Sequence, residues 1–179
     1  GIFRDITERK RAELEREITV GILRRINNTN TIPELLSGLS AFLRQWSGCD
    51  AVGVRFRDGD DFPYFETRGF PDEWSRKEGA VCDRDDRGSL LRDEDGRPRL
   101  HCICGAVLSG HFDPARPFYT EHGTFWTNNL SAIVDDVATG GYLTGGLRLC
   151  PASGFESVAL VPLKAGNEIY GLLQFNDTR

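Results

Sequence analysis

The chain has 179 residues, a mass of 20.0 kDa and a formal net charge of −5 at pH 7. This length suits one domain with its own core and is short for two. The acidic balance argues against a nucleic-acid partner or contact with an anionic membrane, because both need a positive field. No segment approaches the ~18 consecutive apolar residues of a membrane span, and no secretory signal is evident. We therefore expect a cytoplasmic protein.

A long helix is predicted first, from Asp5 to Asn28. Apolar residues recur every fourth position in it, which is the spacing of one helix face. The members of this stripe are Leu14, Ile18, Ile22 and Ile26. The stripe can pack on the domain or pair with a second copy of itself, and we expect a homodimer through this helix.

A second helix is predicted from about Thr31, a suitable N-cap, to Gly48. Strands should follow at 51–56 and 64–68, joined by turn residues. The segment from 71 to 99 is charged and rich in turn residues, so we expect a long loop there. A loop of that length in a compact domain is uncommon and is often functional.

In the last part of the chain, the alternation of apolar and polar residues is clear only near the C-terminal end. Thr127 or Asn128 is expected to cap a short helix. Strands are predicted at 157–163 and 169–175, joined by a hairpin loop. The order of elements predicts an α+β fold with an antiparallel sheet and helices packed on one of its faces.

These segments resemble the GAF domain. The closing hairpin carries the likeness most clearly, in Glu156–Leu163, Gly166 and Ile169–Phe175, and Cys49–Arg55 resembles the family's first strand. The resemblance spans roughly residues 31–179, and it implies a GAF domain with a central antiparallel sheet.

The first residues resemble the end of a PAS domain. In that family the last strand ends in Asp-Ile-Thr, as at Asp5–Thr7, and runs into a connecting helix. The resemblance implies that residues 1–30 are the end of a PAS domain and a linker helix. It also implies a sensory domain that works with other domains of the same chain, commonly those of a histidine kinase or a diguanylate cyclase.

A narrower resemblance is to a cysteine-containing subgroup of GAF domains in bacterial and archaeal sensor proteins, which has no settled ligand. The matching segments are Phe70-Pro71, Cys82, Cys102–Gly105, Phe112–Pro114, Pro117–Thr120, Gly123–Asn128 and Cys150.

Four cysteines are candidate metal ligands, namely Cys82, Cys102, Cys104 and Cys150. Thiolates favour zinc or an iron–sulfur cluster. One metal could hold both Cys102 and Cys104 from a turn, which Gly105 permits. Two other interpretations stay open: a redox pair or disulfide, and inert buried thiols. His101 could join the metal site, but we expect a surface loop histidine there.

An aromatic cluster is the candidate small-molecule site. Its members are Phe118, Tyr119, Phe125, Trp126 and Asn128. Aromatic walls with a few polar groups suit a ligand pocket. The alternative is that these rings anchor a loop onto the sheet.

Catalysis has little support in the sequence. It contains no nucleophile elbow, phosphate loop, kinase signature or zinc-protease motif, so we expect no enzyme and assign no catalytic residue. The alternative is a free methionine sulfoxide reductase, because some GAF-like domains catalyse that reaction with loop cysteines. The cysteine–histidine dipeptide that resembles bilin-binding GAF domains does not occur.

Overall fold

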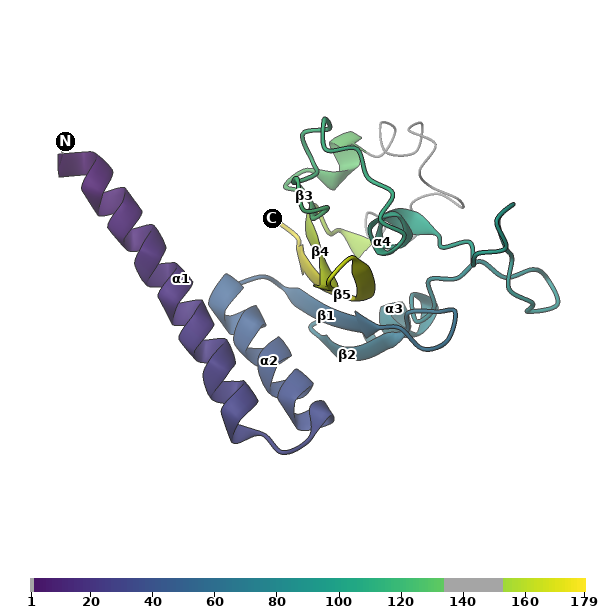
Figure 1. The fold of residues 1–179 in the computed structure, drawn as a ribbon, viewed down its shortest axis with the longest axis horizontal. Helices are drawn as coiled ribbons and strands as arrows, with labels where there is room; N and C mark the ends of the chain where they lie inside the picture. The colour runs from purple at the N-terminus through teal and green to yellow at the C-terminus, as the bar shows by residue number, and fades with distance from the viewer. Residues whose placement is uncertain (1, 134–152) are drawn as a thin grey trace. The chain divides into compact units, whose positions relative to one another are not determined.

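The computed structural model describes residues 2–133 and 153–179 (Figure 1). The chain divides into two compact units, Gly1–Gly48 and Cys49–Arg179. Within the described residues, no helix is both long enough and apolar enough to cross a membrane.

The first unit is a pair of helices, α1 (Ile2–Asn28) and α2 (Ile32–Ser47). Thr31 caps α2 as predicted, because its side chain accepts a hydrogen bond of 3.4 Å from the backbone N–H of Glu34. The helix ends at Gly48, whose φ of 69° is left-handed and favours glycine.

Helix α1 differs from the prediction at its start. It is already helical at Asp5–Thr7, where the PAS resemblance implied the end of a strand. A strand needs a neighbour for its backbone groups, whereas a helix satisfies them within its own segment. Two members of the predicted apolar stripe are exposed, since Leu14 is 52% exposed and Ile26 48% exposed.

The second unit is built on a sheet. The described strands are β1 (Ala51–Phe56), β2 (Tyr64–Arg68), β3 (Phe125–Thr127), β4 (Ser157–Ala165) and β5 (Glu168–Asp177). They form one antiparallel sheet in the order β2-β1-β5-β4-β3. This confirms the predicted α+β class and the closing hairpin.

The short helix expected after Thr127 or Asn128 is present from Leu130, and a strand that was not predicted, β3, precedes it. Phe125 to Thr127 pair with β4 at the edge of the sheet. Helical backbone starts only at Leu130, and the side chain of Asn129 accepts a hydrogen bond of 3.2 Å from the N–H of Ala132. A strand of three residues is too short for alternation to reveal it.

The long charged segment is more ordered than predicted. It contains helix α3 (Asp72–Lys77) and then two copies of one turn. Asp85 and Asp93 each accept hydrogen bonds from the backbone N–H groups two and four residues later. Arg84 and Arg92, which precede these aspartates, each donate to the carbonyl of the glycine in the same turn. We did not recognise this short repeat in the sequence.

Candidate functional site

Polar side chains are buried on one face of the sheet, which we call the inner face. Arg55, Gln174 and Asn176 are each at most 1% exposed. Across β1 and β5, Gly53 pairs with Gln174 and Ala51 pairs with Asn176, so these alternate residues share a face. Amide and guanidinium groups are seldom buried this completely unless they are hydrogen-bonded.

A chain of hydrogen bonds runs across this face. The hydroxyl of Tyr64 donates to Gln174 Oε1 at 2.7 Å, and Gln174 Nε2 donates to Asn176 Oδ1 at 2.8 Å. The thiol of Cys104 also lies 3.9 Å from Gln174 Oε1. Gln174 therefore links β2, the end of β5 and helix α4 (Cys102–Leu108).

Arg55 is held by backbone carbonyl groups. Its Nη1 donates to the carbonyls of Phe62 and Gly79 at 2.9 and 3.2 Å, and its Nη2 donates to the carbonyl of Glu78. The guanidinium also lies over the ring of Tyr64, with Cζ 3.4 Å from the ring centroid. These contacts fix a positive charge inside the unit.

Aromatic rings form one wall of the site. Phe70 and Trp74 stack with centroids 4.1 Å apart and planes 6° apart, and Phe155 meets Phe70 edge-on at 5.6 Å. Gly53 makes room for this wall, because a Cβ there would lie 2.7 Å from Tyr64 Cε1. Trp74 itself is buried, with 4% of its surface exposed.

Helix α4 covers the inner face opposite Gln174. All seven of its residues are buried, and a small cavity of about 10 Å³ remains beneath it. The cavity is lined by Cys102, Ile103, Cys104, Leu130, Val158, Leu160 and Gln174. This volume corresponds to about one water molecule.

The turn that shared metal binding by Cys102 and Cys104 was expected to need is not formed, because these residues lie in α4. The apolar run Cys102–Leu108 buries itself entirely as a helix, and Gly105 serves close packing rather than a turn. A Cβ at Gly105 would lie 2.6 Å from the carbonyl carbon of Leu100. Cys102, at the start of α4, has a φ of 63°, which is uncommon for a residue with a side chain.

The structure brings two of the predicted metal ligands together and separates a third. Cys102 and Cys104 line the same cavity. The thiol of Cys82 instead donates to the carbonyl of Asp60 at 2.9 Å, beside the turn between β1 and β2. Cys150 lies outside the described residues. In the part of the chain that is described, no three histidine, cysteine or acidic side chains group as a metal site, and the metal assignment stays a prediction.

The thiols of Cys82 and Cys104 are poor nucleophiles. Burial, followed by the neighbouring thiol of Cys102, raises the pKa of Cys104 to about 12, although the charge of Arg55 opposes the change. Burial, followed by the charge of Asp61, also raises the pKa of Cys82 to about 12. Both thiols are therefore protonated at neutral pH.

His101 is buried, which corrects the expectation of a surface loop histidine. It is 6% exposed, and its Nδ1 lies 3.2 Å from Oδ1 of the equally buried Asp83. The reason is local pairing: the N–H of His101 donates to the carbonyl of Val81, which draws the start of α4 into the core.

The predicted aromatic pocket divides between two environments. Phe118, Tyr119 and Phe125 are core residues whose rings contact one another at 5.3 to 5.7 Å. Trp126 is 47% exposed and lies with Asn128 at a shallow hollow of about 140 Å³. Successive residues of β3 point to opposite faces of the sheet, so Phe125 and Trp126 cannot line one pocket.

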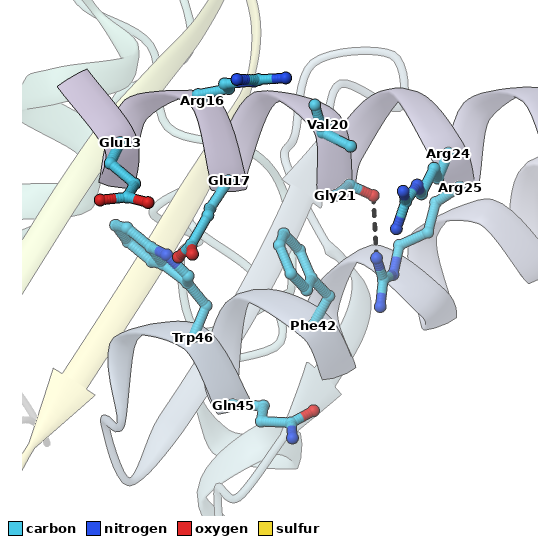
Figure 2. A pocket seen from close by; sticks show the side chains of 10 residues that line it. All are labelled: Glu13, Arg16, Glu17, Val20, Gly21, Arg24, Arg25, Phe42, Gln45 and Trp46. Atoms are coloured by element: carbon cyan, nitrogen blue, oxygen red, sulfur yellow. Dashed lines mark hydrogen bonds between the residues drawn. The ribbon is translucent and has the colours of Figure 1, made fainter.

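The helix pair of the first unit contains a wide, open groove (Figure 2). Its volume is about 760 Å³. A Cβ at Gly21 would lie 2.2 Å from Phe42 Cζ, so the ring packs directly against α1. Arg25 stacks over the same ring at 4.0 Å and donates to the carbonyls of Gly21 and Gly38 at 2.8 and 3.1 Å. Sequence analysis did not anticipate this contact.

Sequence analysis also missed the polar residues of the inner face: Arg55, Tyr64, Gln174 and Asn176. The available signal was polar residues at alternate positions of an otherwise apolar final strand. Their partners are distant in sequence, so the hydrogen bonds could not be predicted.

The comparisons with known proteins agree on the fold. No family model matches the chain, and no curated protein matches its sequence. Among solved structures, the GAF domain of an Acinetobacter phosphoenolpyruvate-protein phosphotransferase is similar, with a TM-score of 0.56 and 12% identity. That match covers 92% of this chain and 78% of the other.

Two further structures extend the comparison. The free methionine-R-sulfoxide reductase of Neisseria meningitidis, in complex with its substrate, has a TM-score of 0.58 and 16% identity, and covers 94% of this chain and 76% of its own. The GAF domain of A. aeolicus nlh2 has a TM-score of 0.53 and 15% identity, and covers 93% and 80%. At these identities the likeness concerns the fold alone, and the chain has the GAF fold.

Proposed function

We propose that the chain is a sensory domain that binds a small molecule on the inner face of its sheet, beneath α4. The single observation that carries this proposal is the buried network of Tyr64, Gln174 and Cys104 on the inner face. Such a network gives a bound molecule polar partners, and the rings of Phe70 and Trp74 give it an apolar wall.

Binding requires α4 to move, because the cavity beneath it is only about 10 Å³. A helix that shifts when a ligand enters is the kind of two-state element from which sensory domains signal. The proposed output is a change in other domains of the same protein, with a histidine kinase or a diguanylate cyclase as the parent.

Thermal unfolding in the presence of a panel of small metabolites tests the binding. A ligand of the inner face should raise the Tm of the full chain and should leave the Tm of a Gln174→Leu variant unchanged. Glu168→Leu, an exposed change on the same strand, should respond like the wild type. Equal stabilisation of all three proteins would place the binding elsewhere and contradict the proposal.

A reductase is the alternative function, and the fold likeness to free methionine-R-sulfoxide reductases supports it. The protonated thiols of Cys82 and Cys104 argue against it, because a nucleophilic cysteine reacts as the thiolate. Turnover of free methionine sulfoxide with thioredoxin as the reductant would establish the reductase, provided that Cys→Ser variants lose it.

A homodimer through α1 remains part of the proposal. It is supported by exposed apolar residues on that helix, namely Leu14, Leu23 and Ile26. Sedimentation velocity should give a dimer for the full chain and a monomer for a Leu14→Glu, Ile26→Glu variant. If the wild-type protein stays monomeric at high concentration, the proposed homodimer through α1 is wrong.

A zinc ion or an iron–sulfur cluster held by cysteines is also still a proposal. Cys102 and Cys104 line the same cavity, which supports such a site, and Cys150 would have to contribute to it. Metal analysis of anaerobically purified protein, compared with a Cys102→Ser, Cys104→Ser variant, tests this. Metal-free wild-type protein would exclude the site.

A further inference from the structure

Three buried N–H groups near the inner face have no acceptor among the described residues. They are Arg55 Nε, Trp74 Nε1 and Asn176 Nδ2. Their side chains are 1%, 4% and 1% exposed. Buried donors in native proteins are nearly always paired with protein groups, ordered water or a ligand, so three orphan donors in one region need an explanation.

The three groups belong to one connected wall. Tyr64 joins them, since Arg55 lies over its ring, and the ring of Trp74 is 5.7 Å from it. The hydroxyl of Tyr64 reaches Asn176 through Gln174. The side chains that carry the three donors are therefore linked through Tyr64 and Gln174.

All three orphan groups are donors, and one of them belongs to a cation. The Nη atoms of Arg55 meet only neutral carbonyl oxygens, and the described residues place no carboxylate in ion-pair contact with its guanidinium. Buried charges are normally paired, because burial removes their hydration. The missing partner is thus rich in acceptors and negatively charged.

We propose that the site takes a small organic carboxylate. The oxygen atoms of this carboxylate together accept hydrogen bonds from Arg55, Trp74 and Asn176. Its carbon skeleton lies against the rings of Phe70 and Phe155. Carboxylates suit this role because charge-assisted hydrogen bonds to arginine are strong. This inference rests on the proposed function and adds the chemical class of the ligand.

Trp74 offers a direct readout. The chain has three tryptophans, and the other two, Trp46 and Trp126, are 43% and 47% exposed. In nitrogen-labelled full chain, each indole N–H gives its own NMR signal. We would titrate the protein with mono- and dicarboxylates of two to five carbons and with the neutral amide of each.

The expected result is a saturable shift of the Trp74 indole signal with at least one carboxylate and none with its amide. The signals of Trp46 and Trp126 should stay in place. Trp74→Phe keeps the ring and loses the donor, so affinity measured by calorimetry should fall at least tenfold. Arg55→Gln should lower it further, and Trp126→Phe should not change it. Dispersed spectra of the variants confirm that they fold.

Two results would overturn the inference that the ligand is a carboxylate. They differ in whether they also contradict the proposed small-molecule site. If only neutral molecules shift the Trp74 signal, the ligand class is wrong while the sensory site stands. If no small molecule shifts it and the indole shows contacts with long-lived water, the donors are paired with water. The inference and the proposed function then fail together.

Discussion

Tyr64 on β2 donates a hydrogen bond of 2.7 Å to Gln174 on β5, although β1 lies between these two strands. The phenol crosses β1 above Gly53, where a Cβ would lie 2.7 Å from its ring. One glycine thus allows a side chain from one strand to fix the amide of a strand two places away. This bond orients the polar centre of the inner face.

Removing the hydroxyl should destabilise the protein. In a Tyr64→Phe variant, Gln174 Oε1 loses its donor at 2.7 Å, and among the described residues the thiol of Cys104, at 3.9 Å, is what remains near it. We expect a loss of about 1–3 kcal/mol in the free energy of unfolding, measured with urea. Tyr170→Phe removes an exposed hydroxyl bonded to Glu168 and should cost less than about 0.5 kcal/mol. Equal losses for the two variants would contradict a special role for Tyr64.

A pair of glycines tests the helix contact in Figure 2. Gly21→Ala would place a Cβ 2.2 Å from the tip of the Phe42 ring, so we expect a loss of about 1–3 kcal/mol. Gly38→Ala meets nothing within 4 Å and should stabilise α2 by up to about 1 kcal/mol, because alanine favours helix. Circular dichroism during thermal unfolding gives both values. A stabilising Gly21→Ala would show that the ring moves aside freely.

Thiol accessibility should follow burial and pKa. Because burial raises the pKa of Cys82 and Cys104 to about 12, both thiols are protonated at pH 7. Cys49 is only partly buried. Iodoacetamide followed by peptide mass spectrometry should modify Cys49 in native protein and the other two only after denaturation. Rapid labelling of Cys104 would mean that α4 opens readily, and it would favour the reductase.

Asp61 should make stability depend on pH in the acid range. Burial by itself would raise the pKa of Asp61, but hydrogen bonds from the N–H groups of Val81, Phe62 and Cys82 outweigh it and lower the pKa. A carboxylate whose pKa is lower in the folded state stabilises the protein above the unfolded value of ~3.9. That stabilisation is lost as the pH falls through the folded pKa.

Urea unfolding of wild type and Asp61→Asn between neutral and acid pH measures this effect. The wild type should have the larger free energy of unfolding at pH 7, and the difference between the two proteins should become smaller below about pH 4. Asp86→Asn, on an exposed turn, should leave stability within about 0.5 kcal/mol at every pH. If the difference in the free energy of unfolding between wild type and Asp61→Asn stayed the same at every pH, the charge of the Asp61 carboxylate would not be the source of the stabilisation.

The sequence predicted the elements that local patterns specify. Thr31, Pro33 and Gly48 mark the limits of α2, and the alternating hairpin from Ser157 to Asp177 was found with small errors at its ends. These signals act within a few residues, so one sequence is enough to detect them.

The candidate site was harder to predict because its contacts are distant in sequence. The cysteines around Gly105 drew attention to the correct region, but the buried helix that carries them was not predicted. Apolar runs of seven residues do not distinguish a short helix from a strand or a loop. The sequence did not indicate that Arg55 and Gln174 belong to the site. Their place in it depends on a strand pairing that joins residues far apart along the chain.

Hydrogen–deuterium exchange most directly tests the claim that a small molecule binds beneath α4. The full chain would be compared with and without the molecule that gives the largest thermal shift. We predict slower exchange in α4 and in the part of β5 around Gln174, and no such change in the Gln174→Leu variant. Protection confined to the groove between α1 and α2, or no protection anywhere, would contradict the account.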